Sequence, residues 1–218
     1  MYGFYINLKK RIDRNIHIEK NILTNDIFQN IKRFNAIENN INPELGCGMS
    51  HLGALNELKK YNEIHKQPYY IIIEDDFMIF NIDNFNLFQT YFDKIKDYDK
   101  WDVIVLTPRG QKTDNDDPFM IENKFKRIIK NQTATAYIIK PYMINELINC
   151  FETACNNMTN KGGFNPYAID QYWKELQNHR SFYYFTERFG GQLVGYSDIE
   201  RRNIDYNPVF ISHTFEKN

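Results

Sequence analysis

The chain has 218 residues and a formal net charge of −1. Such a length accommodates one domain with a substantial core, or a core domain with a small appendage. The near-neutral charge argues against nucleic acid or an anionic membrane as the main partner. The three cysteines, Cys47, Cys150 and Cys155, show neither a CxxC pair nor a Cys/His zinc spacing, which predicts reduced thiols and no dependence on disulfides.

The first ten residues, MYGFYINLKK, predict a strand and not a signal peptide, because the apolar run is short and charge follows it. No stretch of the sequence approaches the roughly 18–20 apolar residues of a membrane-spanning helix. We therefore expect a soluble protein that has no membrane span and is located in the cytoplasm, unless a leader has been removed.

Residues 2–8 predict a strand, residues 15–23 a helix and residues 31–37 a second strand. A basic cluster that includes Arg11 and Arg14 separates the first strand from the helix. A cluster at this place could hold an anionic ligand, since a helix N-terminus adds a favourable dipole. A solvated basic turn is the alternative, and for an isolated cluster it is the more common one.

Residues 42–48, NPELGCG, predict a loop in which the two glycines allow close backbone approach or a positive φ, and residues 49–65 predict a helix. Ser50 is a candidate helix cap or first-turn donor. His51 could contact a ligand, although a lone histidine in the first turn of a helix is more often structural. Both interpretations of His51 stay open on these residues alone.

Residues 69–80, YYIIIEDDFMIF, carry the most informative pattern. The short β-branched and aromatic run at 69–73 predicts a strand buried on both faces, as in a parallel sheet. Glu74, Asp75 and Asp76 follow it and would repel one another without water, cations or a metal. Ligands of open α/β sheets lie beyond the carboxyl ends of the strands, so the pattern predicts a divalent-cation site beside a phosphate. An acidic turn that caps the next helix is the alternative.

The second half of the chain continues the alternation of helices and strands, and we expect one domain over residues 1–218. A polar surface loop is predicted at 107–118 and a flexible loop at 158–166. The helix at 167–178 carries Asp170 in its first turn, and the last strand ends in His213. The patterns predict helices at 82–96, 141–150 and 167–178 and strands at 101–106, 125–130, 133–140, 181–186 and 209–213, of which 125–130 and 133–140 could pair.

Four segments in this order and spacing resemble glycosyltransferase family 25: YINLKKRIDR, GCGMSHLGAL, IIIEDD and the series TATAYIIK, AIDQYW and SDIERR. That family includes bacterial lipooligosaccharide galactosyltransferases and procollagen galactosyltransferases, which modify hydroxylysine. The resemblance extends from Tyr5 to about Asn203. It implies a GT-A type α/β fold with a mostly parallel central sheet flanked by helices. It also implies inverting galactosyl transfer from a UDP-sugar, usually with a divalent cation such as Mn2+.

The resemblance assigns roles to the acidic motif. Asp76 would bind the metal, Asp75 would contact the ribose or the metal, and Glu74 would orient the ribose or waters. His213 resembles the metal-binding histidine that many GT-A enzymes carry near the C-terminus. The proposed nucleotide-binding set is Asn7, Leu8, Arg11, Arg14, Ser50, His51, Glu74 and Asp75.

An inverting displacement needs a base that takes the proton of the acceptor hydroxyl, and Asp170 in AIDQYW is the candidate. An ordinary acid at a helix start, stabilised by the dipole, is the alternative for Asp170. Gln192 and Asp198 could shape the sugar or acceptor pocket. Trp173 could stack on a sugar or belong to the core.

The acceptor, the source and the oligomeric state stay open at this level. The acceptor could be a glycan such as lipooligosaccharide or a hydroxylysine of a collagen-like protein, and the donor sugar could be galactose or glucose. The source could be a bacterium or a large DNA virus, which would place the protein in the bacterial or host cytoplasm. The aromatic-rich C-terminal third could bury a homodimer face. A catalytically silent nucleotide- or carbohydrate-binding module and a phosphohydrolase are the competing functions.

Overall fold

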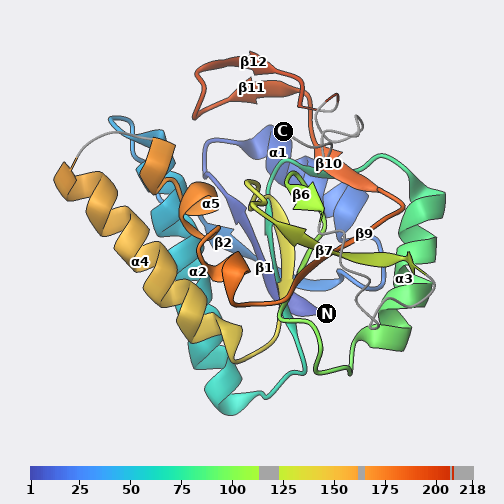
Figure 1. Cartoon of the computed structure of the whole chain (residues 1–218). Helices are drawn as coiled ribbons and strands as arrows, with labels where there is room; N and C mark the ends of the chain where they lie inside the picture. Colours follow the sequence, from blue (N-terminus) through green and yellow to red (C-terminus); the bar gives the residue numbers. More distant parts are fainter. Residues whose placement is uncertain (113–122, 162–164, 207, 209–218) are drawn as a thin grey trace.

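The computed structural model describes residues 1–112, 123–161, 165–206 and 208. The predicted strand at 209–213, with His213, lies outside the described residues. The described part of the chain forms an eight-stranded sheet (Figure 1). Its strands, in spatial order, are β2 (Asn30–Asn35), β1 (Tyr2–Asn7), β3 (Tyr70–Glu74), β8 (Ala136–Ile139), β5 (Val103–Val105), β9 (Phe182–Phe185), β7 (Phe125–Ile129) and β6 (Gln111–Lys112).

The sheet is mixed but mostly parallel in strand direction. Neighbours pair in parallel between β2 and β1, between β1 and β3, and between β5 and β9. The pairs that include β8 or β7 are antiparallel, so these two strands run against the other six. The predicted α/β class with a mostly parallel sheet is therefore confirmed. The expected pairing of 125–130 with 133–140 is wrong, because β8 lies between β3 and β5 while β7 pairs with β9 and β6.

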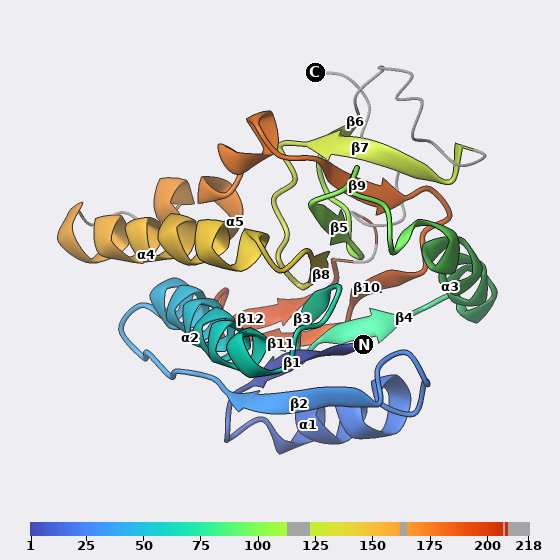
Figure 2. The ribbon, with the colours of Figure 1, turned by 90° about the horizontal axis from the view of Figure 1, so that it is seen from below.

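Helices cover both faces of the sheet (Figures 1 and 2). One face packs against α2 (Pro43–Ile64), α4 (Met143–Lys161) and α5 (Ile169–Tyr172). The other packs against η1 (Ile18–Ile22), which continues α1 (Ile12–His17), and against α3 (Ile82–Ile95).

The central strand β3 divides its side chains between two separate cores. Tyr70 and Ile72 belong to the core beneath α2 and α4, whereas Ile71 and Ile73 belong to the core beneath η1 and α3. All four are fully buried. The prediction that this strand is buried on both faces is confirmed.

Helix α2 begins at Pro43, six residues earlier than predicted, and the expected loop at 42–48 is wrong. The Asn42 side chain accepts a hydrogen bond of 3.0 Å from the Leu45 amide and caps the helix, and Pro43 occupies its first turn. The glycines lie inside the helix and allow close packing. A Cβ atom on Gly46 would lie 2.8 Å from the Ile37 carbonyl oxygen, and one on Gly48 would lie 2.9 Å from Cys155 Sγ.

The predicted helix at 167–178 is interrupted. The chain forms the 3-10 turn η3 (Asn165–Tyr167), then α5, then the 3-10 turn η4 (Leu176–Asn178). Trp173 Nε1 and Gln177 Nε2 both donate to the Asn131 carbonyl, at 2.8 and 3.0 Å, and these long-range bonds fix the irregular path. Trp173 is fully buried, which makes it a core residue. Helix α4 runs to Lys161, beyond the predicted 141–150 and into the predicted flexible loop.

Two small sheets were not predicted. Strand β4 (Phe77–Ile79) pairs with β10 (Gly190–Gln192), and β11 (Gly195–Ser197) forms a hairpin with β12 (Arg202–Ile204). The hairpin lies at the top of the molecule in Figure 1. Among the helices of the described residues, none has the length and apolar character needed to cross a membrane.

Candidate functional site

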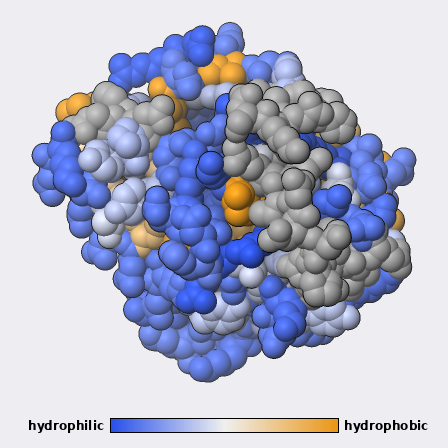
Figure 3. All heavy atoms as spheres, in the orientation of Figure 1, coloured by the Kyte–Doolittle hydropathy of each residue, from blue (hydrophilic) through white to orange (hydrophobic). Residues whose placement is uncertain are grey.

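A cleft of about 780 Å³ opens at the carboxyl ends of β1 and β3. On the face shown in Figure 3, hydrophilic side chains predominate over the described surface. The cleft brings together residues from distant parts of the sequence, as expected for the strand ends of an α/β sheet. Its polar lining includes Arg14, Glu74, Asp75, Asp76, Arg109, Asp170, Gln192 and Asp198.

Asp75 is held by two partners within the protein. Its Oδ2 accepts a hydrogen bond of 2.7 Å from Asn7 Nδ2, and its Oδ1 forms an ion pair of 2.9 Å with Arg14 Nη1. Asn7 is fully buried at the end of β1 and also donates to the Arg11 carbonyl. Burial raises the pKa of Asp75 even though Arg14 and Asn7 oppose the change. Both oxygens of Asp75 therefore already have partners.

The negative charge of Asp76 is less well compensated than that of Asp75. Its Oδ2 lies 3.2 Å from Arg14 Nη1, and Gln192 Nε2 makes only long contacts of 3.4 and 3.5 Å to its two oxygens. Burial raises the pKa of Asp76, Arg14 opposes the change, and Glu74 and Asp75 add to it, so that the pKa reaches about 7. Hard carboxylate oxygens with an excess of negative charge fit a divalent cation such as Mn2+.

The two arginines of the basic cluster after β1 are mostly shielded from solvent, whereas Lys9 and Lys10 beside them are exposed. The Arg11 and Arg14 side chains are 15% and 14% exposed. Arg11 Nη1 pairs with Asp198 at 2.9 Å and also donates to the Tyr196 carbonyl. Arg14 Nη2 donates to the same carbonyl at 3.0 Å. The two arginines thus tie the β11–β12 hairpin to the acidic end of β3.

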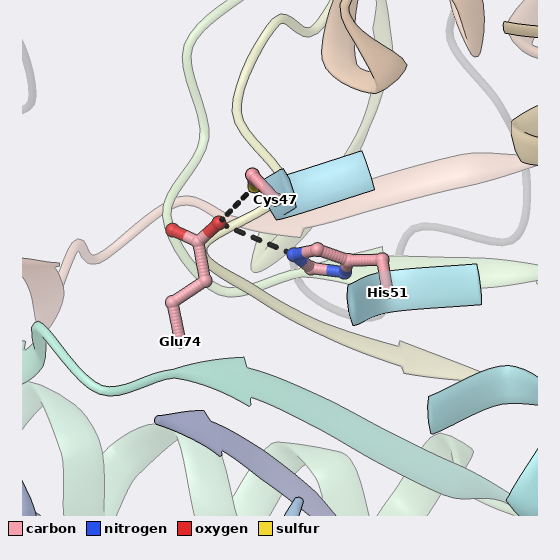
Figure 4. Close-up of side chains that lie close together, drawn as sticks. All are labelled: Cys47, His51 and Glu74. Carbon is pink, nitrogen blue, oxygen red and sulfur yellow. Dashed lines mark hydrogen bonds and ion pairs between the residues drawn. The ribbon is translucent and has the colours of Figure 1, made fainter. Parts of the chain in front are cut away.

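Glu74, the last residue of β3, meets two residues of α2 (Figure 4). Its Oε1 lies 3.5 Å from Cys47 Sγ and 3.2 Å from His51 Nε2. Burial alone would raise the pKa of Glu74, but hydrogen bonds from His51, Cys47 and Thr135 outweigh it and lower the pKa. Burial raises the pKa of the Cys47 thiol. His51 is fully buried, and its Nδ1 lies 3.1 Å from the Tyr137 hydroxyl, so its contact with the cleft runs through Glu74.

Ser50 lines the cleft, and its hydroxyl is held by partners within the protein. Its hydroxyl donates to the Gly46 carbonyl at 2.6 Å and accepts from the Ile37 amide at 2.8 Å. It lies in the interior of α2 and does not cap that helix, so the expectation of a cap is wrong. Leu8 lines the cleft directly after β1.

Asp170, in the first turn of α5, lines the same cleft as the acidic motif. Burial raises its pKa to about 7, with further contributions from Glu74 and Glu44, and Lys174 and Arg109 oppose the change. A carboxyl group that titrates near neutrality suits proton transfer at physiological pH.

Arg109 was missed by the sequence analysis, which placed it in a solvated loop. It follows β5 and lines the cleft. A basic residue and a glycine a few residues after a buried strand are the signal that could have found it. Gln192 and Asp198, expected to shape the sugar or acceptor pocket, both line this cleft.

Comparisons with known proteins identify the fold. No protein-family model and no curated protein matches the sequence, so family 25 stays a resemblance. The structure is similar to that of a glycosyltransferase involved in the glycosylation of the major capsid of PBCV-1, with a TM-score of 0.56 and 6% identity over 92% of this chain and 95% of that one. It also aligns with A197 from STIV, with a TM-score of 0.49 and 11% identity over 93% and 92% of the two chains. The chain has a GT-A type fold.

Proposed function

We propose that this protein is a metal-dependent, inverting glycosyltransferase that moves a hexose, galactose first among the candidates, from a UDP-sugar to a hydroxyl group. The observation that carries the proposal is the position of Asp76, which lies in the cleft at the end of β3 with incomplete charge compensation. The GT-A type fold supports it, since its ligands bind beyond the carboxyl ends of the strands.

Asp76 is proposed to hold a divalent cation such as Mn2+, with Asp75 beside it. His213, outside the described residues, is proposed as a further ligand. A cation at this place would neutralise the charge that develops on the departing diphosphate. Asp75 is oriented by Asn7 and Arg14, and its Oδ1 shares Arg14 Nη1 with Asp76 Oδ2, at 2.9 and 3.2 Å.

The nucleotide is proposed to bind between the end of β1 and the hairpin. Leu8, Arg14 and Glu74 line the cleft. Leu8 would contact the uracil, Arg14 and the neighbouring Arg11 would supply positive charge near the phosphates, and Glu74 would orient the ribose. His51 acts on the nucleotide through Glu74, and Ser50 acts by anchoring α2 to the segment that contains Ile37.

Asp170 is proposed as the base that accepts the proton of the acceptor hydroxyl as the anomeric carbon is attacked. Its pKa of about 7 leaves a substantial fraction deprotonated at neutral pH while keeping the carboxylate basic. The acceptor is proposed to be a glycan or a hydroxylysine side chain, both of which present the hydroxyl that this chemistry requires.

The deciding experiment is a screen of UDP-sugars for Mn2+-dependent UDP release, followed by lactosyl acceptors and hydroxylysine peptides. Asp76→Asn should abolish turnover, while Asp83→Asn, which alters an exposed acid on α3, should leave it unchanged. UDP binding without turnover of any sugar nucleotide would favour a silent binding module instead. Phosphate release without a sugar acceptor would favour a phosphohydrolase.

A further inference from the structure

Cys47, His51 and Glu74 form a compact group of three different donor atoms. Cys47 and His51 lie one turn apart on the same face of α2, and Glu74 approaches them from the end of β3 (Figure 4). Their sulfur, nitrogen and oxygen donor atoms all lie within 4.8 Å of one another. In the proposed transfer reaction Glu74 orients the ribose of the nucleotide, whereas the Cys47 thiol has no role.

Two of the three donor separations match the edges of a tetrahedron around a metal ion, and the third, from Cys47 Sγ to His51 Nε2, is at most 4.8 Å. Zinc bonds of about 2.3 Å to sulfur and about 2.0 Å to nitrogen or oxygen place tetrahedral S···O and N···O pairs about 3.5 and 3.3 Å apart. The distances are 3.5 Å from Cys47 Sγ to Glu74 Oε1 and 3.2 Å from His51 Nε2 to the same oxygen. A charge-assisted hydrogen bond between an imidazolium and a carboxylate would be shorter, at about 2.7–2.9 Å.

The surroundings support the same arrangement. His51 Nδ1 lies 3.1 Å from the Tyr137 hydroxyl, which can hold the ring in the orientation that a ligand needs, as partners of metal-bound histidines commonly do. Cys47 and Glu74 both line the cleft, so a fourth position on the ion would face the cleft. One dication with a thiolate and a carboxylate is electrically neutral, which suits a buried place.

We propose that Cys47 Sγ, His51 Nε2 and Glu74 Oε1 bind a zinc-class transition-metal ion. The set differs in character from the hard oxygen site at Asp76, because thiolate and imidazole select softer ions than carboxylates alone. On binding, the thiol proton of Cys47 leaves to solvent and the imidazole binds in its neutral form. The search for paired cysteines in the sequence misses such a site, because its ligands come from a helix and from a strand end.

Cobalt titration of the full chain, after treatment with a chelator, tests the proposal. We expect one equivalent of the bound Co2+ to show tetrahedral absorption bands and a thiolate-to-cobalt charge-transfer band, apart from any Co2+ at the oxygen site of Asp76. Zinc should displace it. Cys47→Ala should remove the charge-transfer band, and the matched control Cys150→Ala, on α4, should retain it. Tyr137→Phe should weaken zinc affinity by about 10–100-fold.

The outcomes that overturn the proposal are equally definite. Cobalt binding without a thiolate-to-cobalt charge-transfer band overturns the proposal. A charge-transfer band that is lost in Cys150→Ala but still present in Cys47→Ala also overturns it. If circular dichroism shows that Cys47→Ala does not fold, Glu74→Gln replaces it, with loss of tetrahedral binding as the expected result. Asp76→Asn should keep the cobalt band while losing sugar transfer, so the two sites succeed or fail separately.

Discussion

Asp75 and Asp76 are neighbours in the sequence, yet their surroundings differ. Asp75 receives a short bond from Asn7 and an ion pair from Arg14, whereas Asp76 shares the same arginine and has only distant contacts from Gln192. The difference explains why burial raises the pKa of Asp76 to about 7. It also makes Asp76 the carboxylate with most to gain from a cation.

The raised pKa of Asp76 makes a stability prediction with a definite sign. Its pKa in the folded protein is about 7, above the ordinary value of 3.8 for an aspartate carboxyl in water. Between these two values the folded state binds more protons than the unfolded one, so the free energy of unfolding falls as pH rises. Asp76→Asn should therefore raise the melting temperature at pH 8 by a few degrees, about 2–4 °C for each kcal/mol gained.

At pH 4 the same substitution should change the melting temperature much less, because the wild-type carboxyl is then protonated in the folded protein. Thermal scans of both proteins at pH 4 and pH 8 make the comparison. Added Mn2+ should raise the melting temperature of the wild type at pH 8 and leave Asp76→Asn unmoved. Equal melting temperatures of the two proteins at pH 8 without metal would contradict the prediction.

Asp170 carries a kinetic prediction. Asp170→Asn should lower kcat by about 10²- to 10⁴-fold, the range for loss of a general base, with little change in the KM for the sugar nucleotide. In the wild type, kcat should rise with pH through about 7, because the base acts in its deprotonated form. Steady-state rates from pH 5.5 to 8.5 measure this. If kcat of Asp170→Asn still rose with pH through about 7, the titrating group would be a different residue.

At the scale of the element, helix α2 links the cap at Asn42 to the site. Cys47, Ser50 and His51 all lie within its first nine residues, so fraying of the N-terminal turn would displace them. Asn42→Ala should destabilise the protein by about 1 kcal/mol through loss of the capping bond to Leu45. The control Asn56→Ala changes an exposed position inside the same helix and should be neutral or slightly stabilising. Urea midpoints compare the two, and equal midpoints would contradict the capping role.

The elements also show where sequence reasoning succeeds. The β-branched run before Glu74 predicts β3 well, because a strand buried on both faces needs an apolar residue at every position. Strand β8 has an equally apolar sequence, and nothing in it tells that it inserts antiparallel between β3 and β5. The break at 167–178 depends on bonds from Trp173 and Gln177 to Asn131, some forty residues earlier in the chain, which helical periodicity cannot reveal.

The candidate site was predictable to a similar degree. A strand end with three acids indicates where the cleft lies, and Asp170 does line the same cleft. Asp75 and Asp76 differ in their partners because of the position of Arg14, and no pattern in the neighbouring sequence specifies that position. The convergence of Cys47 and His51 on Glu74 likewise depends on how α2 packs against the sheet.

At the scale of the whole molecule, one sheet separates two cores, and each core contains one of the two tryptophans: Trp101 lies beneath α3 and Trp173 beneath α4. Because β3 and its neighbours belong to both cores, we expect the two cores to unfold together.

Trp101→Phe and Trp173→Phe each leave one tryptophan whose fluorescence reports on one core. In each variant, the urea midpoint from fluorescence should coincide with the midpoint from far-UV circular dichroism. Separate midpoints would show that the two cores melt independently and would contradict the one-domain expectation.

The guanidinium of Arg14 touches Asp75, Asp76 and the Tyr196 carbonyl of the β11–β12 hairpin at once. A ligand that attracts the Arg14 guanidinium weakens the hydrogen bond between Arg14 and the hairpin. Because such coupling is reciprocal, detachment of the hairpin must change the affinity for that ligand by the same factor. The binding and release of a ligand in the cleft are therefore coupled to the position of the β11–β12 hairpin, which lies more than a hundred and eighty residues after Arg14 in the sequence.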